Sequence, residues 1–502
     1  MDSDERLADS KENTGGLKAA IEHNAGAKPN TELLETLKTA LPQYFDAGGN
    51  FKKDKFDAEL AASNVAEAHD GYRLGFVGKD YARLQTGRAS ETVIAPDCAH
   101  NALPENARSG NIFITGDNID ALRHLANAYE NQIKLIYIDP PYNTGKEFVY
   151  SDSFEFADEK LQSALGYTDA EIARLKSIQG KSSHSAWLAF MYPRLKIAQK
   201  LLTPDGVIFV SVDDNEQANL KLLMDDVFGE GNFVGLMTIQ SNPRGSQSSR
   251  FLSSVHEYIF MYSKNENTLE LKGVTKSKES ENEYSEADKN GRKYRLLGLR
   301  QRGGAWRKEQ RPKMHYPIYI NPYDGQVSLQ QDNIFTVEVI PQRPTGELGR
   351  WTWSKEKLEK GNSLIVGKKI NRSGQQDAWD IFRKDYIDVD DGSEKTAKIK
   401  TIWIEKDINY QNAKNEIKDL FANSEIFDYP KPTYIIKRLA SMLYCEDNDL
   451  ILDFFAGSAT TAHAVMQLNA EDGGTRKYIM VQRDEPTNEN SEARKAGYHT
   501  ID

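Results

Sequence analysis

The stretch Lys134-Leu-Ile-Tyr-Ile-Asp-Pro-Pro-Tyr-Asn-Thr-Gly145 decides the fold. Residues 135–138 form a short apolar run rich in β-favouring side chains, which predicts a strand buried on both faces. Pro140 and Pro141 have no N–H to donate and each fixes its own φ, so the strand must stop at Asp139. The stretch therefore predicts a stiff turn at the carboxyl end of a strand, where open α/β sheets place their ligands.

The chemistry of this turn follows from its polar groups. Asp139 and the carbonyl of Pro140 are two acceptors held close together, and two such acceptors can receive both hydrogens of a planar amino group. The ring of Tyr142 offers a flat face on which a base can stack. A strand-ending turn with a capping Asp is the alternative interpretation. The Tyr142–Asn143 pair and the buried strand before it favour a functional site.

The residues of this turn carry a resemblance to a known family. Asp139-Pro-Pro-Tyr142 resembles the catalytic motif of amino-directed DNA methyltransferases, and the extension Asn143-Thr-Gly145 is typical of adenine-specific members. The resemblance implies transfer of a methyl group from S-adenosyl-L-methionine to adenine N6, without a metal. It also implies that Asp139, Pro140, Pro141 and Tyr142 are catalytic.

A second informative unit lies near the C-terminus. Residues 449–453 predict a strand, residues 454–461 a tight turn of small residues, residues 462–469 a helix and residues 477–482 another strand, which together make a mononucleotide-binding half. Asp453-Phe-Phe-Ala-Gly-Ser-Ala-Thr-Thr461 resembles the S-adenosylmethionine motif of the same family, and Pro430-Lys-Pro432 resembles the segment that accompanies it. The cofactor contacts implied by the resemblance are Lys431, Pro432, Asp453, Phe455, Ala456, Gly457, Ser458, Thr460 and Gln482.

Two departures from the family pattern concern this cofactor motif. Ala459 stands where the pattern has its last glycine, so its methyl group could crowd the cofactor or demand a φ that Ala tolerates poorly. We expect tolerance because Gly457 is kept. Gln482 stands where related enzymes often have an acid that binds the cofactor ribose, and Asp484 and Glu485 follow it.

The chain ends soon after the strand of residues 477–482, although a doubly wound sheet would normally add another strand. Either that strand comes from elsewhere in the chain, or the chain is truncated at its C-terminus. Truncation is the expectation here.

The order of the motifs is that of β-class amino-methyltransferases, and the modification (Mod) subunits of type III restriction–modification systems are the most similar group. The resemblance covers roughly residues 75–485. It predicts an α/β fold with a doubly wound, mostly parallel sheet, an inserted target-recognition domain and a helical N-terminal region. The expected boundaries are a largely helical region of possible dimerisation at 1–100, a catalytic half at 101–264, a DNA-binding insert at 265–425 and a cofactor-binding half at 426–502.

Elements between the motifs are also predicted. Residues 111–115 predict a strand, and the turn Gly116-Asp-Asn118 has residues that cap the helix after it. Residues 185–202 predict a strong amphipathic helix, Pro204-Asp-Gly206 a turn and residues 207–212 another buried strand. The pair His256-Glu257 could mimic an acid–base pair, but strand alternation is expected to separate their faces.

The insert contains a basic run from Lys289 to Lys313 in which Glu309 is the only acidic residue. Such a run inside a chain of net charge −11 favours phosphate contact over a merely solvated face. A second candidate patch surrounds residues 342–353. The candidate DNA-binding residues are Arg292, Lys293, Arg295, Arg300, Arg302, Arg307, Lys308, Arg311, Arg343 and Arg350.

Composition sets outer limits. A length of 502 residues suggests two to four domains. With 39% hydrophobic and 28% charged residues the chain has the composition of a soluble globular protein. Cys98 and Cys445 lie far apart without ligand-like spacing, which fits a reducing cytoplasm. No apolar run is long enough to span a membrane, and no signal-peptide core is present.

The sequence therefore predicts a site-specific adenine-N6 DNA methyltransferase that flips its target base. The expected partners are double-stranded DNA, a second copy of the chain in a homodimer and a restriction (Res) helicase–nuclease subunit. The alternatives are a non-catalytic DNA-recognition subunit and an amino-methyltransferase that acts on cytosine N4 or on RNA.

Overall fold

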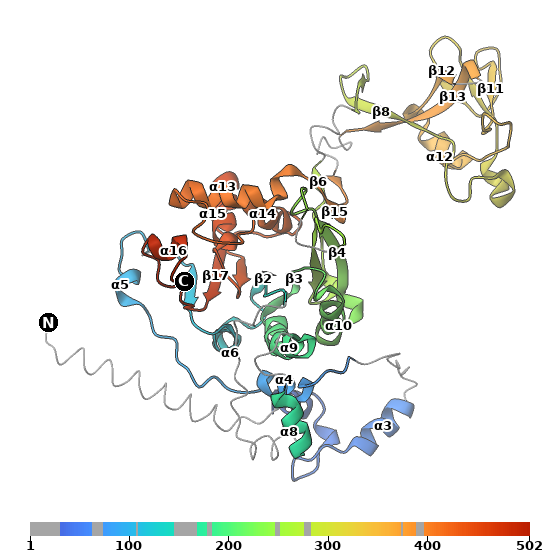
Figure 1. The fold of residues 1–502 in the computed structure, drawn as a ribbon. Helices are drawn as coiled ribbons and strands as arrows, with labels where there is room; N and C mark the ends of the chain where they lie inside the picture. Colours follow the sequence, from blue (N-terminus) through green and yellow to red (C-terminus); the bar gives the residue numbers. More distant parts are fainter. Residues whose placement is uncertain are drawn as a thin grey trace. The chain divides into compact units, whose positions relative to one another are not determined.

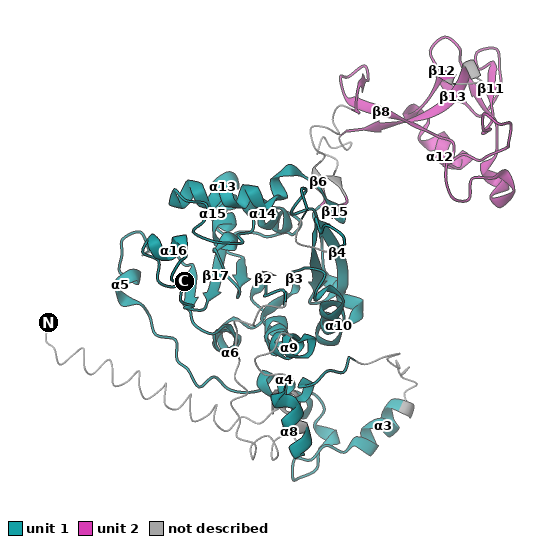
Figure 2. Ribbon diagram, in the orientation of Figure 1, with its two compact units in different colours: residues 1–272, 400–502 teal, residues 273–399 magenta. Residues whose placement is uncertain are grey.

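The computed structural model describes residues 31–62, 74–106, 109–144, 168–177, 183–245, 251–275, 283–372, 375–387 and 396–501 (Figure 1). The chain forms two compact units, which Figure 2 colours separately. The first unit contains residues 1–272 and 400–502, and the second contains residues 273–399.

The first unit is built on an eight-stranded sheet in the order β1-β17-β16-β2-β3-β5-β4-β15. Its strands are β1 (Ile112–Thr115), β2 (Ile133–Ile138), β3 (Leu202–Val212), β4 (Phe233–Ile239), β5 (Glu257–Ser263), β15 (Ile402–Trp403), β16 (Leu450–Asp453) and β17 (Lys477–Gln482). Neighbouring strands are parallel, except that β5 is antiparallel to both β3 and β4. The predicted mostly parallel sheet is confirmed.

Helices cover both faces of this sheet, as the prediction of a doubly wound fold requires. Figure 1 shows α6 (Asn118–Tyr129), α9 (His184–Leu201) and α10 (Gln217–Phe228) on one side, and α13 (Tyr410–Phe421), α14 (Thr433–Ser441) and α15 (Thr460–Asp472) on the other. The side chains of Ile133, Leu135, Ile136 and Ile138 in β2 are fully buried between these layers. Each such side chain contributes about 1.5–3 kcal/mol to folding.

The strand beyond β17 comes from elsewhere in the chain. β1 pairs in parallel with β17, with Ile112 opposite Ile479 and Thr115 opposite Gln482. This pairing is the first of the two alternatives, in which the strand comes from elsewhere in the chain. Truncation at the C-terminus stays a prediction.

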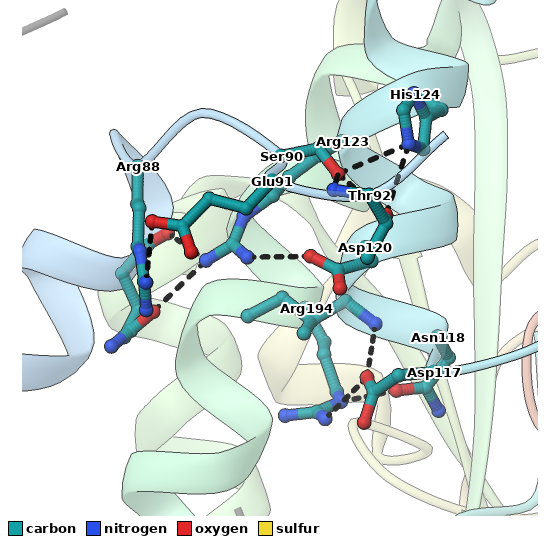
Figure 3. Close-up of polar contacts among 12 residues, drawn as sticks. Arg88, Ser90, Glu91, Thr92, Asp117, Asn118, Asp120, Arg123, His124 and Arg194 are labelled. Atoms are coloured by element: carbon teal, nitrogen blue, oxygen red, sulfur yellow. Dashed lines mark hydrogen bonds and ion pairs between the residues drawn. The ribbon is translucent and has the colours of Figure 1, made fainter. Parts of the chain in front are cut away.

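Helices of the N-terminal region flank the first unit. They are α2 (Thr31–Ala40), α3 (Lys53–Ala62), α4 (Lys79–Thr86) and α5 (Cys98–Asn101). Tyr81, Ala82 and Leu84 of α4 are buried. The extended chain after α4 is held to α6, because the hydroxyl oxygens of Ser90 and Thr92 lie 3.0 and 3.2 Å from Nε2 of His124 (Figure 3). A role of this region in dimerisation stays a prediction.

The second unit is smaller than the expected insert of residues 265–425. Residues 265–272 and 400–425 belong to the first unit, because β15 hydrogen-bonds to β4 and α13 buries Ala413 and Ile417 there. The apolar residues of α13 do recur with helical spacing, a signal in residues 410–421 that could have indicated this helix. Short helices α8 (Asp169–Lys176) and α16 (Glu492–Lys495) complete the first unit.

The second unit is mainly β-structure. One sheet has the order β12-β13-β8-β7, another β10-β9-β11, and β6 pairs with β14. Their bounds are β6 (Val274–Thr275), β7 (Glu286–Ala287), β8 (Lys293–Gly298), β9 (Ile318–Ile320), β10 (Val327–Ser328), β11 (Val337–Val339), β12 (Ile365–Arg372), β13 (Gln375–Tyr386) and β14 (Thr396–Ala397). The described residues of this unit also form the α-helix α12 (Lys355–Lys360). The fully buried indole of Trp351 lies in a separate core of this unit. None of the helices in the described residues is long and apolar enough to cross a membrane.

Pro204-Asp-Gly206, expected as a turn, lies inside β3. Leu202 pairs with Ile133 and Val207 pairs with Leu135, so the register shifts across this segment. The extra residues form a bulge. Gly206 permits it, because a residue without a side chain lets two backbone segments approach closely. A Cβ atom at Gly206 would lie 2.9 Å from the carbonyl oxygen of Ile133 and 3.0 Å from the backbone nitrogen of Thr203.

Gly206→Ala should therefore lower the free energy of unfolding by about 1–3 kcal/mol, because its methyl group overpacks the bulge. Gly231→Ala is the matched control, because nothing lies within 4 Å of a Cβ atom built there. Thermal denaturation of both variants measures the difference. Equal melting temperatures would contradict the expected clash.

Candidate functional site

The turn after β2 is held rigidly. The indole N–H of Trp187 donates a hydrogen bond to the carbonyl of Pro141 at 2.7 Å, and Trp187 is itself fully buried. Asn143 adopts a φ of 55° and its side-chain amide donates to Glu216 Oε1 at 2.5 Å. Asn is one of the few residues other than Gly that enter this region readily. The predicted stiff turn at the carboxyl end of a strand is confirmed.

Asp139 is held by two neighbours. The Tyr142 hydroxyl donates to Asp139 Oδ1 at 2.7 Å, and Lys431 Nζ lies 3.3 Å from the same oxygen. Burial raises the pKa of Asp139, the positive charge of Lys431 opposes that rise, and Glu257 adds to it, so the pKa stays above its ordinary value. Both of these contacts are to Oδ1, and the Asp139 side chain is 25% exposed.

Lys431 reaches into the catalytic turn from the second half of the sequence. Its Nζ donates to Glu257 Oε2 at 2.7 Å and to the Tyr142 hydroxyl at 2.8 Å. Burial lowers the pKa of Lys431, but the negative charges of Asp139 and Glu257 outweigh burial and raise it well above its ordinary value. The resemblance implies a cofactor contact for Lys431, which stays a prediction. Lys431 lines the cavity beside the turn after β16, and its ammonium group lies next to Asp139 and Tyr142.

Glu257 and Tyr410 are parts of this site that sequence reasoning did not assign. Strand alternation separates His256 from Glu257 as expected: the His256 ring contacts the Tyr258 hydroxyl at 2.8 Å, while Glu257 faces Lys431. The Tyr410 hydroxyl donates to Glu257 Oε2 at 2.5 Å. The alternation of β5 places Glu257 on the buried face, but nothing local in the sequence names its partners.

The predicted cofactor turn begins at Asp453, whose two carboxylate oxygens are both used within the turn. They accept hydrogen bonds from the Phe455 N–H at 3.0 Å and the Thr461 hydroxyl at 2.6 Å. Burial raises the pKa of Asp453 to about 7. Gln482, at the end of β17, accepts from the Gly457 N–H at 2.8 Å. Asp453 and Gln482 therefore shape the turn from its two flanking strands.

Ala459 shows one of the two difficulties expected for it, a φ that alanine tolerates poorly. Its φ of 56° and ψ of 30° lie in the left-handed region, which costs a residue with a Cβ atom about 1–2 kcal/mol. Gly457 also has a positive φ, of 53°. Ala459 thus holds a left-handed conformation at a conformational cost that glycine would not carry.

A cavity of about 1550 Å³ opens beside this turn. Its lining includes Lys431, Ser458, Ala459 and Thr460, together with Asp117 after β1. The cavity exceeds the size of typical small-molecule sites, and small side chains leave the turn backbone open to it. Backbone N–H groups at the start of α15 and the Asp117 carboxylate offer both donors and acceptors. These residues fit a ligand that carries amino, carboxylate and hydroxyl groups, as S-adenosylmethionine does.

A buried arginine fixes Asp117 and Asn118 at this cavity (Figure 3). Nε of Arg194, which is fully buried, donates to Asn118 Oδ1 at 2.6 Å. The Asn118 amide in turn donates to the carbonyl of Phe454 at 2.9 Å. Asp117 caps α6 by accepting from the Ile119 N–H at 2.9 Å, as its place in the sequence predicts. The turn after β1 is therefore tied to the cofactor turn.

The candidate DNA-binding residues differ in their surroundings. Arg295 pairs with Asp385 at 2.9 Å and with Glu283, and buried Arg350 donates to the carbonyl of Ala305. These two arginines hold the second unit together, so we expect little phosphate contact from them. Lys293, Arg302, Arg307 and Arg311 are exposed, and Arg292, Arg300, Lys308 and Arg343 are partly exposed. DNA contact by these eight stays a prediction.

An aromatic ring adds a second kind of surface to this basic group. The guanidinium of Arg343 stacks on Trp306 at 3.5 Å from the ring centroid, and Arg307 lies 5.4 Å from it. Arg292 likewise lies 4.5 Å from the Tyr386 ring. In the described part of the chain, no three His, Cys, Asp or Glu side chains converge as a metal site.

The sequence matches one family of known proteins over most of its length. Residues 133–489 match the DNA methylase family of N6- and N4-directed enzymes. The Mod subunit of the type III restriction–modification enzyme StyLTI of Salmonella typhimurium is 40% identical, over 97% of this chain and 71% of the relative. The EcoPI Mod subunit of Escherichia phage P1 is 39% identical, over 94% of this chain and 73% of the relative.

Solved structures give a weaker likeness. A DNA modification methylase from Thermus thermophilus in complex with S-adenosylmethionine is 14% identical, with a TM-score of 0.29 over 74% of this chain and 87% of the other. The cytosine-N4-specific PvuII methyltransferase is 12% identical, with a TM-score of 0.31 over 78% of this chain and 93% of the other. Because both TM-scores are low, the assignment rests on the sequence matches.

The family match covers the catalytic turn, the second unit and the cofactor turn together, and the relatives extend the match over nearly the whole chain. The chain belongs to the DNA methylase family, whose members use S-adenosylmethionine, and within it to the group of type III Mod subunits.

Proposed function

We propose that this chain methylates the N6 amino group of adenine in duplex DNA as the modification subunit of a type III restriction–modification system. The observation that carries the proposal is the place of Asp139 and Tyr142 at the carboxyl end of β2, next to β16 and its cofactor turn. Three relatives named as type III Mod subunits align over 94–97% of the chain and support the specific role.

The proposed chemistry needs the target adenine outside the duplex, at a cost of a few kcal/mol. The Tyr142 ring would stack on the base, while the Asp139 carboxylate and the Pro140 carbonyl accept the two amino hydrogens. This orients the nitrogen lone pair along the line of attack, and alignment supplies most of the acceleration. S-adenosylmethionine supplies an electrophilic methyl group on a sulfonium centre.

A positive charge develops on the target base during the proposed reaction. The amino nitrogen becomes positive as it gains the methyl group and then sheds a proton to solvent. The negative Asp139 carboxylate stabilises that developing charge. In the chain without DNA, the Tyr142 hydroxyl occupies Asp139 Oδ1 at 2.7 Å. We infer that Tyr142 turns from Asp139 when the base enters, which frees the carboxylate and presents the ring.

The cofactor would lie along the turn from Gly457 to Thr460. Ser458 and Thr460 are joined by a hydrogen bond of 3.0 Å between their hydroxyls, and Thr460 also donates to the Lys431 carbonyl at 3.0 Å. Asp117 provides an acceptor at the end of β1. Phe455, Ala456 and Pro432 are the remaining expected contacts; all three are buried around the turn.

The partners are proposed on the names of the relatives. We expect double-stranded DNA to be read by the second unit, and a restriction subunit to associate with the chain in the cytoplasm. A homodimer is likewise a proposal from family resemblance. Methylation of cytosine N4 or of RNA, and DNA recognition without catalysis, are the alternatives that the following measurements separate.

Asp139→Ala should lower the rate of methyl transfer at least about 10³-fold, because it removes the acceptor for the amino group. Cofactor affinity, measured by calorimetry, should stay close to that of the unchanged chain. Asp214→Ala is the control, because Asp214 is an exposed acid after the neighbouring strand β3. Mass spectrometry of the nucleosides in methylated DNA identifies the product. N4-methylcytosine in place of N6-methyladenine would refute the choice of base.

Gly457→Val should raise the dissociation constant for S-adenosylmethionine by about tenfold or more, since its side chain would block approach to the turn backbone. Gly473→Val is the matched control. Gly473 also has a positive φ, of 74°, but it ends α15 and a Cβ atom there would meet nothing within 4 Å. Equal loss of affinity in both variants would show that backbone strain, and not the cofactor site, is responsible.

Arg302→Ala and Arg311→Ala should each weaken DNA binding and reduce the slope of log affinity against log salt by about 1, because each would remove one phosphate contact. Lys360→Ala on α12 is the control, an exposed cation outside the candidate group. Fluorescence anisotropy with labelled duplex at several salt concentrations measures the slopes. Unchanged slopes in both arginine variants would remove these residues from the interface.

A further inference from the structure

Glu257 and Lys431 form a buried ion pair beside the catalytic turn, although neither belongs to the motif Asp139–Tyr142. Lys431 Nζ lies 2.7 Å from Glu257 Oε2, and the two side chains are 7% and 3% exposed. Glu257 begins β5, and Lys431 comes just before α14. The pair therefore links two segments of the first unit that the second unit separates in the sequence.

The contacts around Glu257 are concentrated on one oxygen. Oε2 accepts from Lys431 and from the Tyr410 hydroxyl at 2.5 Å, and it lies 3.0 Å from the oxygen of the Tyr142 hydroxyl. The other oxygen, Oε1, is buried and has no hydrogen-bond partner within the described ranges. A buried pair with an unsatisfied atom is a poor source of stability. Perturbed charges at a cleft are instead a mark of function.

The same ammonium group also faces the catalytic acid. Lys431 Nζ lies 3.3 Å from Asp139 Oδ1, and the Tyr142 hydroxyl joins Asp139 to Glu257 through contacts of 2.7 and 3.0 Å. Two carboxylates and one ammonium leave the cluster with one net negative charge. That is the charge needed opposite an amino nitrogen that becomes positive during methyl transfer.

We propose that Glu257 and Lys431 are positioning residues for methyl transfer, which act together to leave one negative charge on Asp139 facing the target amino group. Without Lys431, two neighbouring buried carboxylates would share a proton. Without Glu257, Lys431 would pair with Asp139 alone and cancel its charge. The inference rests on the proposed function, because it takes Asp139 as the group that holds the amino group.

Several charged and titratable groups around the cluster influence the charges of Asp139 and Glu257. Lys431, Glu257, Tyr142 and Tyr410 contact it directly. Tyr137 of β2 and Asp453 of β16 interact with Asp139 electrostatically, and Asp213 after β3 interacts with Glu257. Lys431 is the cation that lowers the pKa of Asp139, and Glu257 is the carboxylate that raises it.

The two single variants should shift the acid limb of the kcat profile in opposite directions. Activity is lost as the pH falls through the pKa of Asp139. Lys431→Met removes the positive neighbour, so the limb should move to higher pH, by about 1–3 pH units. Glu257→Gln removes the negative neighbour, so the limb should move to lower pH. Both variants should also lower the maximal kcat by about a hundredfold.

The double variant Lys431→Met/Glu257→Gln gives the sharpest test. It keeps one net negative charge, on Asp139, so its maximal kcat should exceed that of either single variant by about tenfold. A double variant whose maximal kcat is no higher than that of the worse single variant would show that the two charges do not act together. That result would overturn the proposal, as would acid limbs that stay in place in both single variants.

Control variants separate charge from folding. Lys431→Arg keeps the positive charge, so its acid limb should stay near that of the unchanged chain even if kcat falls. Lys79→Met and Asp226→Asn break another partly buried ion pair of the same unit, with a distance of 2.7 Å. They should lower the melting temperature without moving the limb. An acid limb that shifts in these control variants would refute the assignment to Lys431 and Glu257.

A measurement without turnover keeps this inference distinct from the proposed function. The carboxyl ¹³C signal of Asp139, assigned with Asp139→Asn, reports its ionisation in the protein without DNA. Its pKa should rise in Lys431→Met and fall in Glu257→Gln. If it does so while the unchanged chain makes no N6-methyladenine, the proposed function fails and the charge balance stands. If the chain methylates adenine but the signal does not respond, the charge balance fails alone.

Discussion

The parallel pairing of β2 with β16 is the constraint on which the site depends. Ile136 lies opposite Leu452, although about two thirds of the chain separates them, including the whole second unit. Parallel neighbours end at the same edge of a sheet, so the turn after Asp139 and the turn after Asp453 must emerge side by side. The proximity of these two turns is therefore a consequence of strand register before any side chain of the proposed site is considered.

Charge at this edge is arranged for reactivity at the expense of stability. Glu257, Lys431 and Asp453 are all nearly or fully buried, and desolvation of each ion costs several kcal/mol unless a partner offsets it. This cost is smaller for Asp453 for two reasons: its raised pKa of about 7 favours the neutral form, and its carboxyl group accepts two hydrogen bonds within its turn. Apolar side chains at these positions would pack without this desolvation cost. Burial of the hydrophobic sheet core, including the buried strands β2 and β3, must therefore offset it.

The sequence was most informative where a function and a backbone conformation require the same residues. The two prolines after β2 and the small residues after β16 identify both turns and their neighbours. Glu257 and Tyr410 were missed because each looks ordinary in its own segment, and only tertiary folding brings them to Lys431. Arg295 and Arg350, both predicted to contact DNA, make contacts within the second unit that the sequence does not reveal. Arg295 pairs with Asp385 and Arg350 donates to the Ala305 carbonyl, and both partners are distant in sequence.

The position of the second unit explains how recognition and chemistry can be separated in one chain. The chain leaves the first sheet after β5 and returns to it at β15, and β6 pairs with β14 where the unit begins and ends. The pairing of β6 with β14 places few constraints on the residues between these two strands, because the register of the first sheet is set by its own strands. Residues 273–399, for which we propose DNA recognition, can therefore vary without moving Asp139. Tyr410 and Lys431, which follow the unit, cannot vary in the same way, because they contact Glu257 and the side chains of the turn after β2.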